Sequence, residues 1–222
     1  MKLTIFGATG GIGSQLVAQA LAAGHSVTAV VRDPSRVIPG ARAVQADLMH
    51  ADDSEALRDA VAGADVVIST LGPRSVADIG IASAGTRAIV SAEKSTGVCR
   101  LLVISAAPIG TLPAPDRPVP PRHDPGDGFL MRHLLAPLTK AVLRRQYADL
   151  AQMESAVRTS GLDWTIVRPP RLTNKALTRR YRLAYGRNVR RGLTVSRADV
   201  ADVLLRLLDD PLALRQTVAV AQ

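Results

Sequence analysis

The chain opens MKLTIFGATGGIG (residues 1–13), a short run of strand-forming residues followed by four glycines within seven positions. Glycine inside a regular element costs about 0.5–1 kcal/mol relative to alanine, so a dense cluster needs a reason in the backbone. A helical pattern follows over Ile12–Ala23 and stops at Gly24, a residue that tolerates the left-handed conformation after a last helical turn. The stretch therefore predicts a strand, a tight turn and a helix in succession.

The same alternation of strand and helix continues along the chain. The expected strands are Leu3–Phe6, Ser26–Val31, Ala41–Gln45, Asp65–Ser69, Arg100–Ser105 and Asp163–Val167, and the expected helices are Ile12–Ala23, Ser54–Ala62, Ile81–Thr96 and Tyr147–Ser160. Strands separated by helices of this length indicate βαβ units and a parallel sheet. We predict one α/β domain over residues 1–222, a doubly wound parallel sheet (Rossmann fold) with strand order 3-2-1-4-5-6. A small C-terminal substrate lobe is expected at about 173–193.

Composition excludes several classes of protein. The single cysteine, Cys99, excludes an internal disulfide, and the four histidines show no metal-binding spacing, so no metal site is expected. No segment approaches the roughly 18 apolar residues of a membrane span, and the N-terminus lacks a signal-peptide pattern. We expect a soluble, cytoplasmic protein whose oligomeric state the sequence leaves open.

The glycine cluster acquires a chemical meaning from its position between a strand and a helix. The start of a helix offers unpaired N–H groups and a partial positive charge, which suit a pyrophosphate. Gly7 and Gly10 would permit the turn and a close approach, while Gly13 would let the helix pack on the sheet. A tight turn alone would need only one or two glycines, so the pattern favours dinucleotide binding.

The form Gly7-Ala8-Thr9-Gly10-Gly11-Ile12-Gly13 resembles the GxxGxxG fingerprint of extended and atypical short-chain dehydrogenase/reductases. Five later stretches, VTAVVRDPSR, ADLMHADD, VVISTLG, LLVISAA and SGLDWTIVRPP, are similar to successive strand-end motifs of the atypical NAD(P)H-binding members. Within these the chain is most similar to the biliverdin-IXβ reductase/flavin reductase group, with NmrA-like proteins next. The resemblance covers nearly the whole chain and implies NADPH as cofactor, with NAD as the alternative.

The resemblance also implies cofactor contacts after the carboxyl ends of the strands, where open α/β sheets bind ligands. On the phosphate side it puts Gly7, Thr9, Gly10, Gly11, Ile12 and Gly13 on the pyrophosphate, and Arg32 and Arg36 near the 2′-phosphate. It puts Asp47 and Leu48 at the adenine, and Leu71, Gly72 and Arg74 on the ribose side. Ser105 and Ala106 would lie at the nicotinamide, with Pro169 as a further contact.

Cofactor choice depends on the residues after the second strand. Arg32 and Arg36 favour NADPH, because a guanidinium group binds a phosphate well. Asp33 lies 20 positions after Gly13, near where an acidic residue takes the ribose hydroxyls of NAD. A plain surface pair between Arg32 and Asp33 is the remaining alternative.

The Tyr-x-x-x-Lys pair that protonates carbonyl substrates in most of this superfamily is missing. At the position of the lysine, Tyr147 is followed by Ala151, Tyr181 by Tyr185, and Tyr185 by Val189. With no positioned acid, the acceptor must need little help. We expect hydride transfer to a flavin, quinone or bilin that takes its proton from solvent, and we interpret Tyr147 as a packing or surface aromatic. The alternative is a non-catalytic NAD(P)-sensing regulatory protein, as in NmrA-like members.

Ser105 is the candidate catalytic residue, a polar contact for the nicotinamide or the acceptor, unless it only caps the turn after its strand. Pro108–Gly128 contains seven of the chain's fourteen prolines and follows the fifth strand, so a substrate lid is favoured over an inert excursion. His123 on this segment and Arg171 in RPPR are the candidate contacts for a planar or anionic acceptor. Leu134–Val142 is expected to form a short apolar helix.

The net charge of +9 is concentrated in one segment. Arg168–Arg191 carries nine cations and no acid, whereas the rest of the chain has nineteen of each sign. We expect this basic segment to attract an anionic cofactor or substrate, the alternative being a solvated basic face. Tyr181 and Tyr185 are interleaved with the cations, as in some nucleic-acid surfaces, but no recognised nucleic-acid module is present and no such partner is expected.

Overall fold

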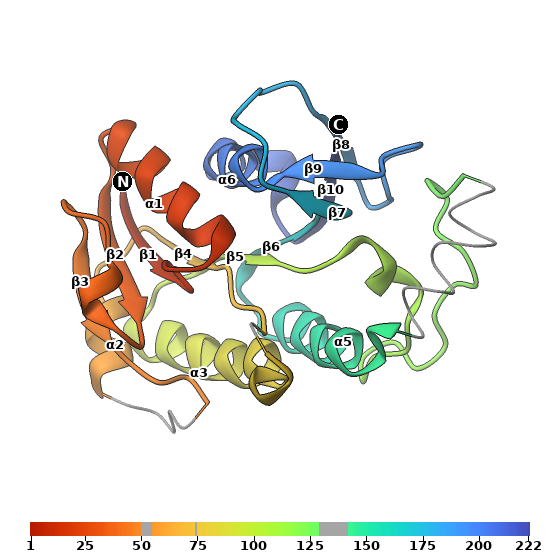
Figure 1. Ribbon diagram of the computed structural model, residues 1–222. Coiled ribbons are helices and arrows are strands. Elements are labelled where there is room, and N and C mark those ends of the chain that lie inside the picture. Colours follow the sequence, from red (N-terminus) through yellow and green to blue (C-terminus); the bar gives the residue numbers. More distant parts are fainter. Residues whose placement is uncertain (50–54, 74, 129–141) are drawn as a thin grey trace.

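The computed structural model describes residues 1–49, 55–73, 75–128 and 142–222. Its centre is an eight-stranded sheet with helices on both faces (Figure 1). The strands are β1 (Lys2–Phe6), β2 (Ser26–Val31), β3 (Arg42–Gln45), β4 (Val66–Ser69), β5 (Arg100–Ile104), β6 (Asp163–Arg168), β8 (Arg182–Tyr185) and β10 (Gln216–Ala221), and β7 (Arg171–Thr173) pairs with β9 (Thr194–Ser196) separately. The helices are α1 (Gly11–Ala22), α2 (Glu55–Val61), α3 (Ile81–Thr96), α5 (Arg144–Arg158) and α6 (Arg197–Arg206).

The order of the strands confirms the predicted doubly wound sheet. The sheet runs β3-β2-β1-β4-β5-β6-β10-β8, so its first six strands have the order 3-2-1-4-5-6, and all of their pairings are parallel. The sheet continues further than predicted, because β10 pairs in parallel with β6 and β8 pairs antiparallel with β10.

Alternating side chains of the strands build a core on each face of the sheet. On β1, Leu3 and Ile5 pack into the cluster that includes residues of α1 and α6, whereas Phe6 packs into the cluster formed with α2, α3 and α5. This division follows from the two-residue period of a strand. Burial on both faces explains why the strands read as nearly continuous runs of Val, Ile and Leu.

The C-terminal part departs most from the expectations. β8 lies inside the 173–193 range expected to form a lobe, yet it is the edge strand of the main sheet. Helix α6 was not expected, although Ser196 accepts from the Asp199 N–H at 2.9 Å as its N-terminal cap, a local signal that the sequence contains. The expected helix at Leu134–Val142 lies outside the described residues except for Val142.

One buried acidic residue stands out on the inner face of α3. Glu93 is 0% exposed, and neither of its carboxylate oxygens has a hydrogen-bond partner among the described residues. Burial raises the pKa of Glu93 to about 9. The side chain is therefore protonated at neutral pH, and keeping a polar group there costs stability.

No helix within the described residues is long and apolar enough to cross a membrane. The described part of the chain also holds no cluster of three metal-ligating side chains of the His, Cys, Asp or Glu type.

Candidate functional site

The turn between β1 and α1 requires glycine. Gly7 has a left-handed φ of +73°, and a Cβ at Gly13 would lie 2.2 Å from the carbonyl oxygen of Gly7. The Gly10 N–H closes the turn by donating to that same oxygen at 2.9 Å. Among the described residues no side chain caps α1, and its first turn holds no acid. The N–H groups at the start of α1 are therefore suited to an anionic ligand.

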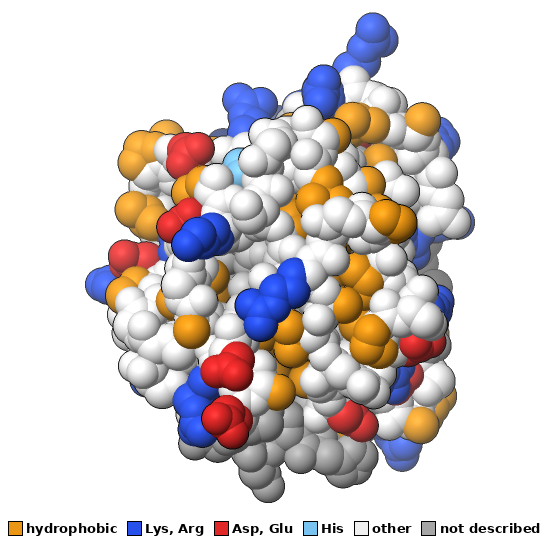
Figure 2. Space-filling view, turned by 90° about the vertical axis from the view of Figure 1, so that its left-hand side faces the viewer, with side chains coloured by type: hydrophobic (Ala, Val, Ile, Leu, Met, Phe, Trp, Pro, Cys, Tyr) orange, Lys and Arg blue, Asp and Glu red, His pale blue; other side chains and the backbone are white. Residues whose placement is uncertain are grey.

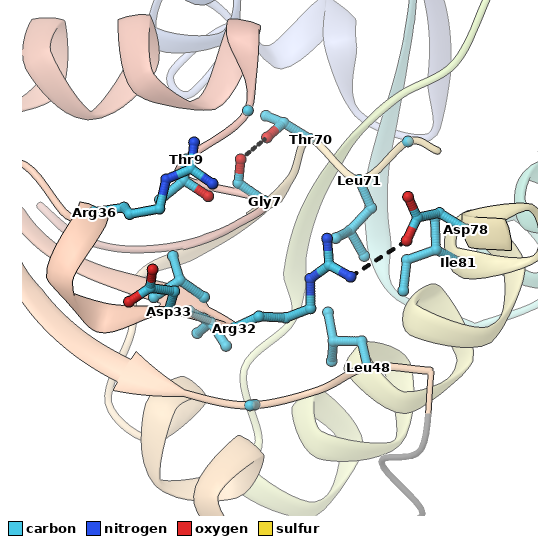
Figure 3. A pocket seen from close by; sticks show the side chains of 15 residues that line it. Gly7, Thr9, Arg32, Asp33, Arg36, Leu48, Thr70, Leu71, Asp78 and Ile81 are labelled. Atoms are coloured by element: carbon cyan, nitrogen blue, oxygen red, sulfur yellow. Dashed lines mark hydrogen bonds and ion pairs between the residues drawn. The ribbon is translucent and has the colours of Figure 1, made fainter. Parts of the chain in front are cut away.

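A cleft opens beside this turn, at the carboxyl ends of β1, β2, β3 and β4 (Figure 3). Eight residues that were predicted to contact the cofactor line it, namely Gly7, Thr9, Gly10, Arg32, Arg36, Leu48, Leu71 and Gly72. Seven further residues complete the lining, namely Val30, Val31, Asp33, Ala46, Thr70, Asp78 and Ile81. Of these, Thr70 could have been found from its place in the STLG stretch after β4, whereas nothing near Asp78 in the sequence indicates its position.

An apolar surface forms one side of the cleft. It is formed by Leu48 and Leu71 from two loops and by Ile81 from the start of α3 (Figure 3). Gly85 of α3 makes this packing possible, because a Cβ there would lie 2.6 Å from Cδ1 of Leu71 and 3.4 Å from Cβ of Leu48. The arrangement suits a flat apolar group such as a nucleobase.

Other predicted contacts lie beside the cleft rather than in its lining. Ile12 is 8% exposed and packs into the core, so only its backbone faces the turn. Gly11 lies under the side chain of Arg197. Asp47 uses its carboxylate to accept from the Met49 N–H at 3.1 Å, which shapes the loop after β3. Arg74 lies outside the described residues.

Arg32 spans the mouth of the cleft and pairs with an unexpected residue. Its Nη1 lies 3.3 Å from Oδ1 of Asp78, which follows β4 (Figure 3). The alternative partner considered from sequence, Asp33, instead accepts from the N–H of Ser35 at 3.1 Å and from its hydroxyl at 2.7 Å. These bonds from Ser35 lower the pKa of Asp33. The alternative of a surface pair between Arg32 and Asp33 is therefore not formed, because Asp33 caps the short turn that follows it. Arg36 and Thr9 also line the cleft, on the side away from Asp78 in the view of Figure 3.

Ser105, the candidate catalytic residue, lies at the end of β5 outside the lining of the cleft and is 5% exposed. Its hydroxyl donates to Oε1 of Glu154 on α5 at 2.6 Å. Glu154 is fully buried and also accepts from Arg168 and Arg158. Burial by itself raises the pKa of Glu154, but the charge of Arg168 and the hydrogen bonds outweigh burial and hold this pKa below its ordinary value.

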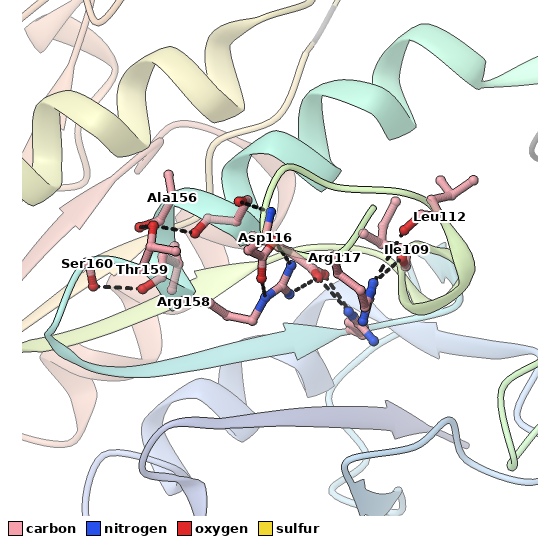
Figure 4. A network of polar contacts seen from close by, with 12 residues as sticks. Ile109, Leu112, Asp116, Arg117, Ala156, Arg158, Thr159 and Ser160 are labelled. Carbon is pink, nitrogen blue, oxygen red and sulfur yellow. Dashed lines mark hydrogen bonds and ion pairs between the residues drawn. The ribbon is translucent and has the colours of Figure 1, made fainter. Parts of the chain in front are cut away.

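The hydrogen-bond network around Glu154 extends through Arg158 to the proline-rich segment, Pro108–Gly128. Arg158 donates to Asp116 through Nε at 2.5 Å and Nη2 at 2.9 Å (Figure 4). These bonds lower the pKa of Asp116 to about 2. The beginning of the segment after β5 is thus attached to α5 by a chain of charged groups.

A second contact holds the far end of this segment. Asp124 is 5% exposed and accepts at 2.8 Å from the N–H groups of both Gly126 and Asn188. Asn188 also donates to Asp127 at 2.9 Å. His123, the predicted substrate contact in this segment, is exposed. The segment is anchored at two points, and its role as a substrate lid stays a prediction.

The remaining predicted residues lie near the ends of β5 and β6. The Ala107 N–H donates to the carbonyl oxygen of Pro169 at 3.0 Å, which brings Ala106 and Pro169 onto adjacent chain segments. Tyr147 is 8% exposed within an apolar cluster that Ala106 contacts, as expected for a packing aromatic. Arg171 is exposed at the start of β7.

Eight of the nine cations of the basic segment are exposed, whereas Arg168 is buried and Tyr181 and Tyr185 are half-buried. Tyr181 and Tyr185 donate to Asp202 and Asp210, each at 2.5 Å, and burial with these contacts raises the pKa of each tyrosine to about 12. In Figure 2, basic side chains project at the top of the molecule, the end where residues near 180 lie in Figure 1, whereas both signs mix lower down. The tyrosines therefore add little aromatic surface to the exposed cations.

Comparisons with known proteins place the chain in a family. A family model described as NAD(P)H-binding matches residues 7–211. A 3-diazoavenalumate denitrifying reductase from a Streptomyces species is 36% identical over 119 residues, which are 48% of this chain and 38% of that protein. The chain thus matches little more than a third of the length of this relative.

Two solved structures are similar over the whole chain. A short-chain dehydrogenase/reductase from Veillonella parvula in complex with NADP has a TM-score of 0.78 at 21% identity, with 100% of this chain and 94% of that chain covered. An anaerobillin reductase from Escherichia coli O157:H7 has a TM-score of 0.76 at 22% identity, with 100% and 97% covered. At these identities the likeness shows a shared fold.

Proposed function

Because the chain belongs to the NAD(P)H-binding family, we propose that it is an NADPH-dependent reductase that passes hydride to a planar or anionic acceptor such as a flavin, quinone or bilin. The observation that carries this proposal is the cleft beside the glycine turn. Its features fit a dinucleotide: among the described residues no side chain caps α1 and its first turn holds no acid, so its N–H groups are available to a pyrophosphate. Arg32 and Arg36 at the rim supply cations for a phosphate.

NADPH supplies the hydride when it is bound, and the residues of this chain bind and orient it. The start of α1 would hold the pyrophosphate, and Leu48 and Leu71 would hold the base. Tyr147 is buried in an apolar cluster and is followed four positions later by Ala151, so a Tyr–Lys pair is not formed there. We propose that the acceptor takes its proton from solvent, which suits a conjugated acceptor better than a simple ketone.

A second candidate is a protein that binds NAD(P)H and senses it without turnover. The observation that favours it is the hydroxyl of Ser105, which donates to Glu154 and has no second proton to offer. The basic segment suits contact with an anionic partner under either function. We expect small molecules rather than nucleic acid to be that partner.

The test follows NADPH absorbance at 340 nm with FMN, menadione or biliverdin as acceptor. Turnover with any of them, lost or weakened in Arg36→Ala, supports a reductase. Arg42→Ala is the matched control, because Arg42 is an exposed arginine on β3 outside the lining of the cleft. Tight NADPH binding without oxidation of any acceptor would favour the sensing protein. Failure to bind NADPH or NADH would refute both.

A further inference from the structure

A buried charged network fixes the direction in which the Ser105 hydroxyl points. Four donors converge on Glu154: Oε1 accepts from Ser105 at 2.6 Å and from Nε of Arg168 at 2.8 Å, and Oε2 accepts from Nη2 of Arg168 at 2.5 Å and from Nη1 of Arg158 at 2.8 Å. The distance from Ser105 is typical of a hydroxyl that donates to a carboxylate. With two arginines beside it, Glu154 is ionised and has no proton to return.

This network limits the hydrogen bonds that the Ser105 hydroxyl can form with a ligand. A serine hydroxyl has one proton and two lone pairs, and its only proton is directed to Glu154. Ser105 can therefore accept a hydrogen bond from a ligand but cannot donate one without giving up a charge-assisted bond in a buried site. Ser105 follows the carboxyl end of β5, the edge at which open α/β sheets bind ligands.

We propose that Glu154 is a positioning residue that makes Ser105 an obligate acceptor, and that Ser105 receives an N–H from the carboxamide of the nicotinamide rather than protonating the substrate. This inference rests on the proposed function, because it assumes a nicotinamide cofactor. It assigns the network a role in orienting the cofactor, and it leaves the proton of the reaction to solvent. Arg168 and Arg158 act by keeping both oxygens of Glu154 occupied as acceptors.

A pair of cofactor analogues isolates the proposed contact. In 3-acetylpyridine adenine dinucleotide phosphate a methyl group replaces the amino group of the carboxamide, so the N–H donor is absent and the rest of the cofactor is kept. The native protein should bind NADP⁺ roughly three- to tenfold more tightly than this analogue, the change expected for one neutral hydrogen bond. Calorimetry measures both affinities without an acceptor or turnover.

Variants at Ser105 separate a ligand contact from a structural role. Ser105→Ala should weaken NADP⁺ to the level of the analogue and abolish the preference between the two. Ser105→Thr keeps the hydroxyl and is the matched control, so it should retain the preference. A merely structural serine would give equal losses for both ligands and leave their ratio unchanged.

Glu154→Gln tests the direction of the hydroxyl. The glutamine amide can replace only one carboxylate oxygen as acceptor, and its amino group is least unfavourable on the Oε1 side, which faces one arginine donor instead of two. Ser105 would then accept from the glutamine and turn its proton outward, so the preference for NADP⁺ over the analogue should be lost.

The outcomes distinguish this inference from the proposed function. Binding of NADP⁺ with no preference over the analogue in the native protein, or a preference that survives Ser105→Ala, would overturn the inference alone. Absence of any NADP⁺ binding would overturn the proposed function and this inference with it. If Glu154→Gln does not fold, the Ser105 variants with the two ligands still decide.

Discussion

Replacement of Arg32 tests how the cleft chooses between NADPH and NADH. In the structure Nη1 of Arg32 lies 3.3 Å from Oδ1 of Asp78, and the arginine side chain is 56% exposed. An exposed pair of this kind contributes about 0.2–1 kcal/mol, whereas a charge-assisted bond to a 2′-phosphate contributes about 1.5–3 kcal/mol. The 2′-phosphate must displace Asp78 from Arg32, so the contribution of the exposed pair is subtracted from that of the phosphate bond. Arg32→Ala should therefore reduce the binding free energy of NADPH by roughly 0.5–2.8 kcal/mol, or about a two- to hundredfold loss of affinity. NADH affinity should change little.

Asp78→Asn should change NADPH affinity in the opposite direction. Asparagine removes the competing charge yet keeps an oxygen for Ser75, whose N–H and hydroxyl both donate to Oδ2 of Asp78. NADPH should bind about 1.4- to fivefold more tightly, the affinity equivalent of the exposed pair. In the Arg32→Ala background most of this gain should vanish, because the two residues act through one contact.

Calorimetric titration of both cofactors into the native protein and these variants decides between the arrangements. Arg42→Ala, an exposed arginine outside the lining of the cleft, controls for the loss of a surface charge. Equal losses for NADPH and NADH in Arg32→Ala would refute the reasoning and show that Arg32 supports the cleft. Weaker NADPH binding in Asp78→Asn would show that Asp78 positions Arg32 instead of competing for it. A native preference for NADH, abolished by Asp33→Ala, would assign the ribose to Asp33.

Three other outcomes are expected. Glu93→Gln should raise the free energy of unfolding by about 3 kcal/mol at pH 7. The pKa of Glu93 is about 9 in the folded protein and has its ordinary value of 4.5 in the unfolded chain, so the stability of the wild-type protein falls as pH rises from 4.5 through 9. Urea unfolding at pH 5, 7 and 9 measures the gain, which should be small at pH 5 and largest at pH 9; a gain independent of pH would contradict this. Gly13→Ala should destabilise by at least about 1–3 kcal/mol in thermal unfolding, since its Cβ would meet the backbone of Gly7, whereas Gly11→Ala meets only the flexible side chain of Arg197 and should cost less. DNA and RNA should not bind with sub-micromolar affinity at about 150 mM salt, where contacts to phosphates alone weaken steeply; tighter binding would assign the basic segment to nucleic acid.

The sequence by itself determined the first six strands, their order and the glycine turn. These features depend on neighbouring residues: the short apolar runs of the strands, glycines that end helices, and the strand–glycine–helix succession at residues 1–13. The position of the cleft follows from them, because sheet topology brings the carboxyl ends of β1, β2 and β4 together. The family resemblance carried by the sequence motifs predicted eight of the residues that line the cleft.

Only the tertiary structure decided which charged groups pair. Arg32 and Asp78 are 46 positions apart, and Ser105 and Glu154 are 49 apart, so no local pattern links them. Asp33 is adjacent to Arg32 in sequence, yet it bonds to Ser35, because a carboxylate two residues before a free N–H reaches it with little loss of conformational entropy. The partner of a long charged side chain is chosen by which elements the sheet brings within its reach. That choice leaves Arg32 across the mouth of the cleft and directs the proton of Ser105 to Glu154.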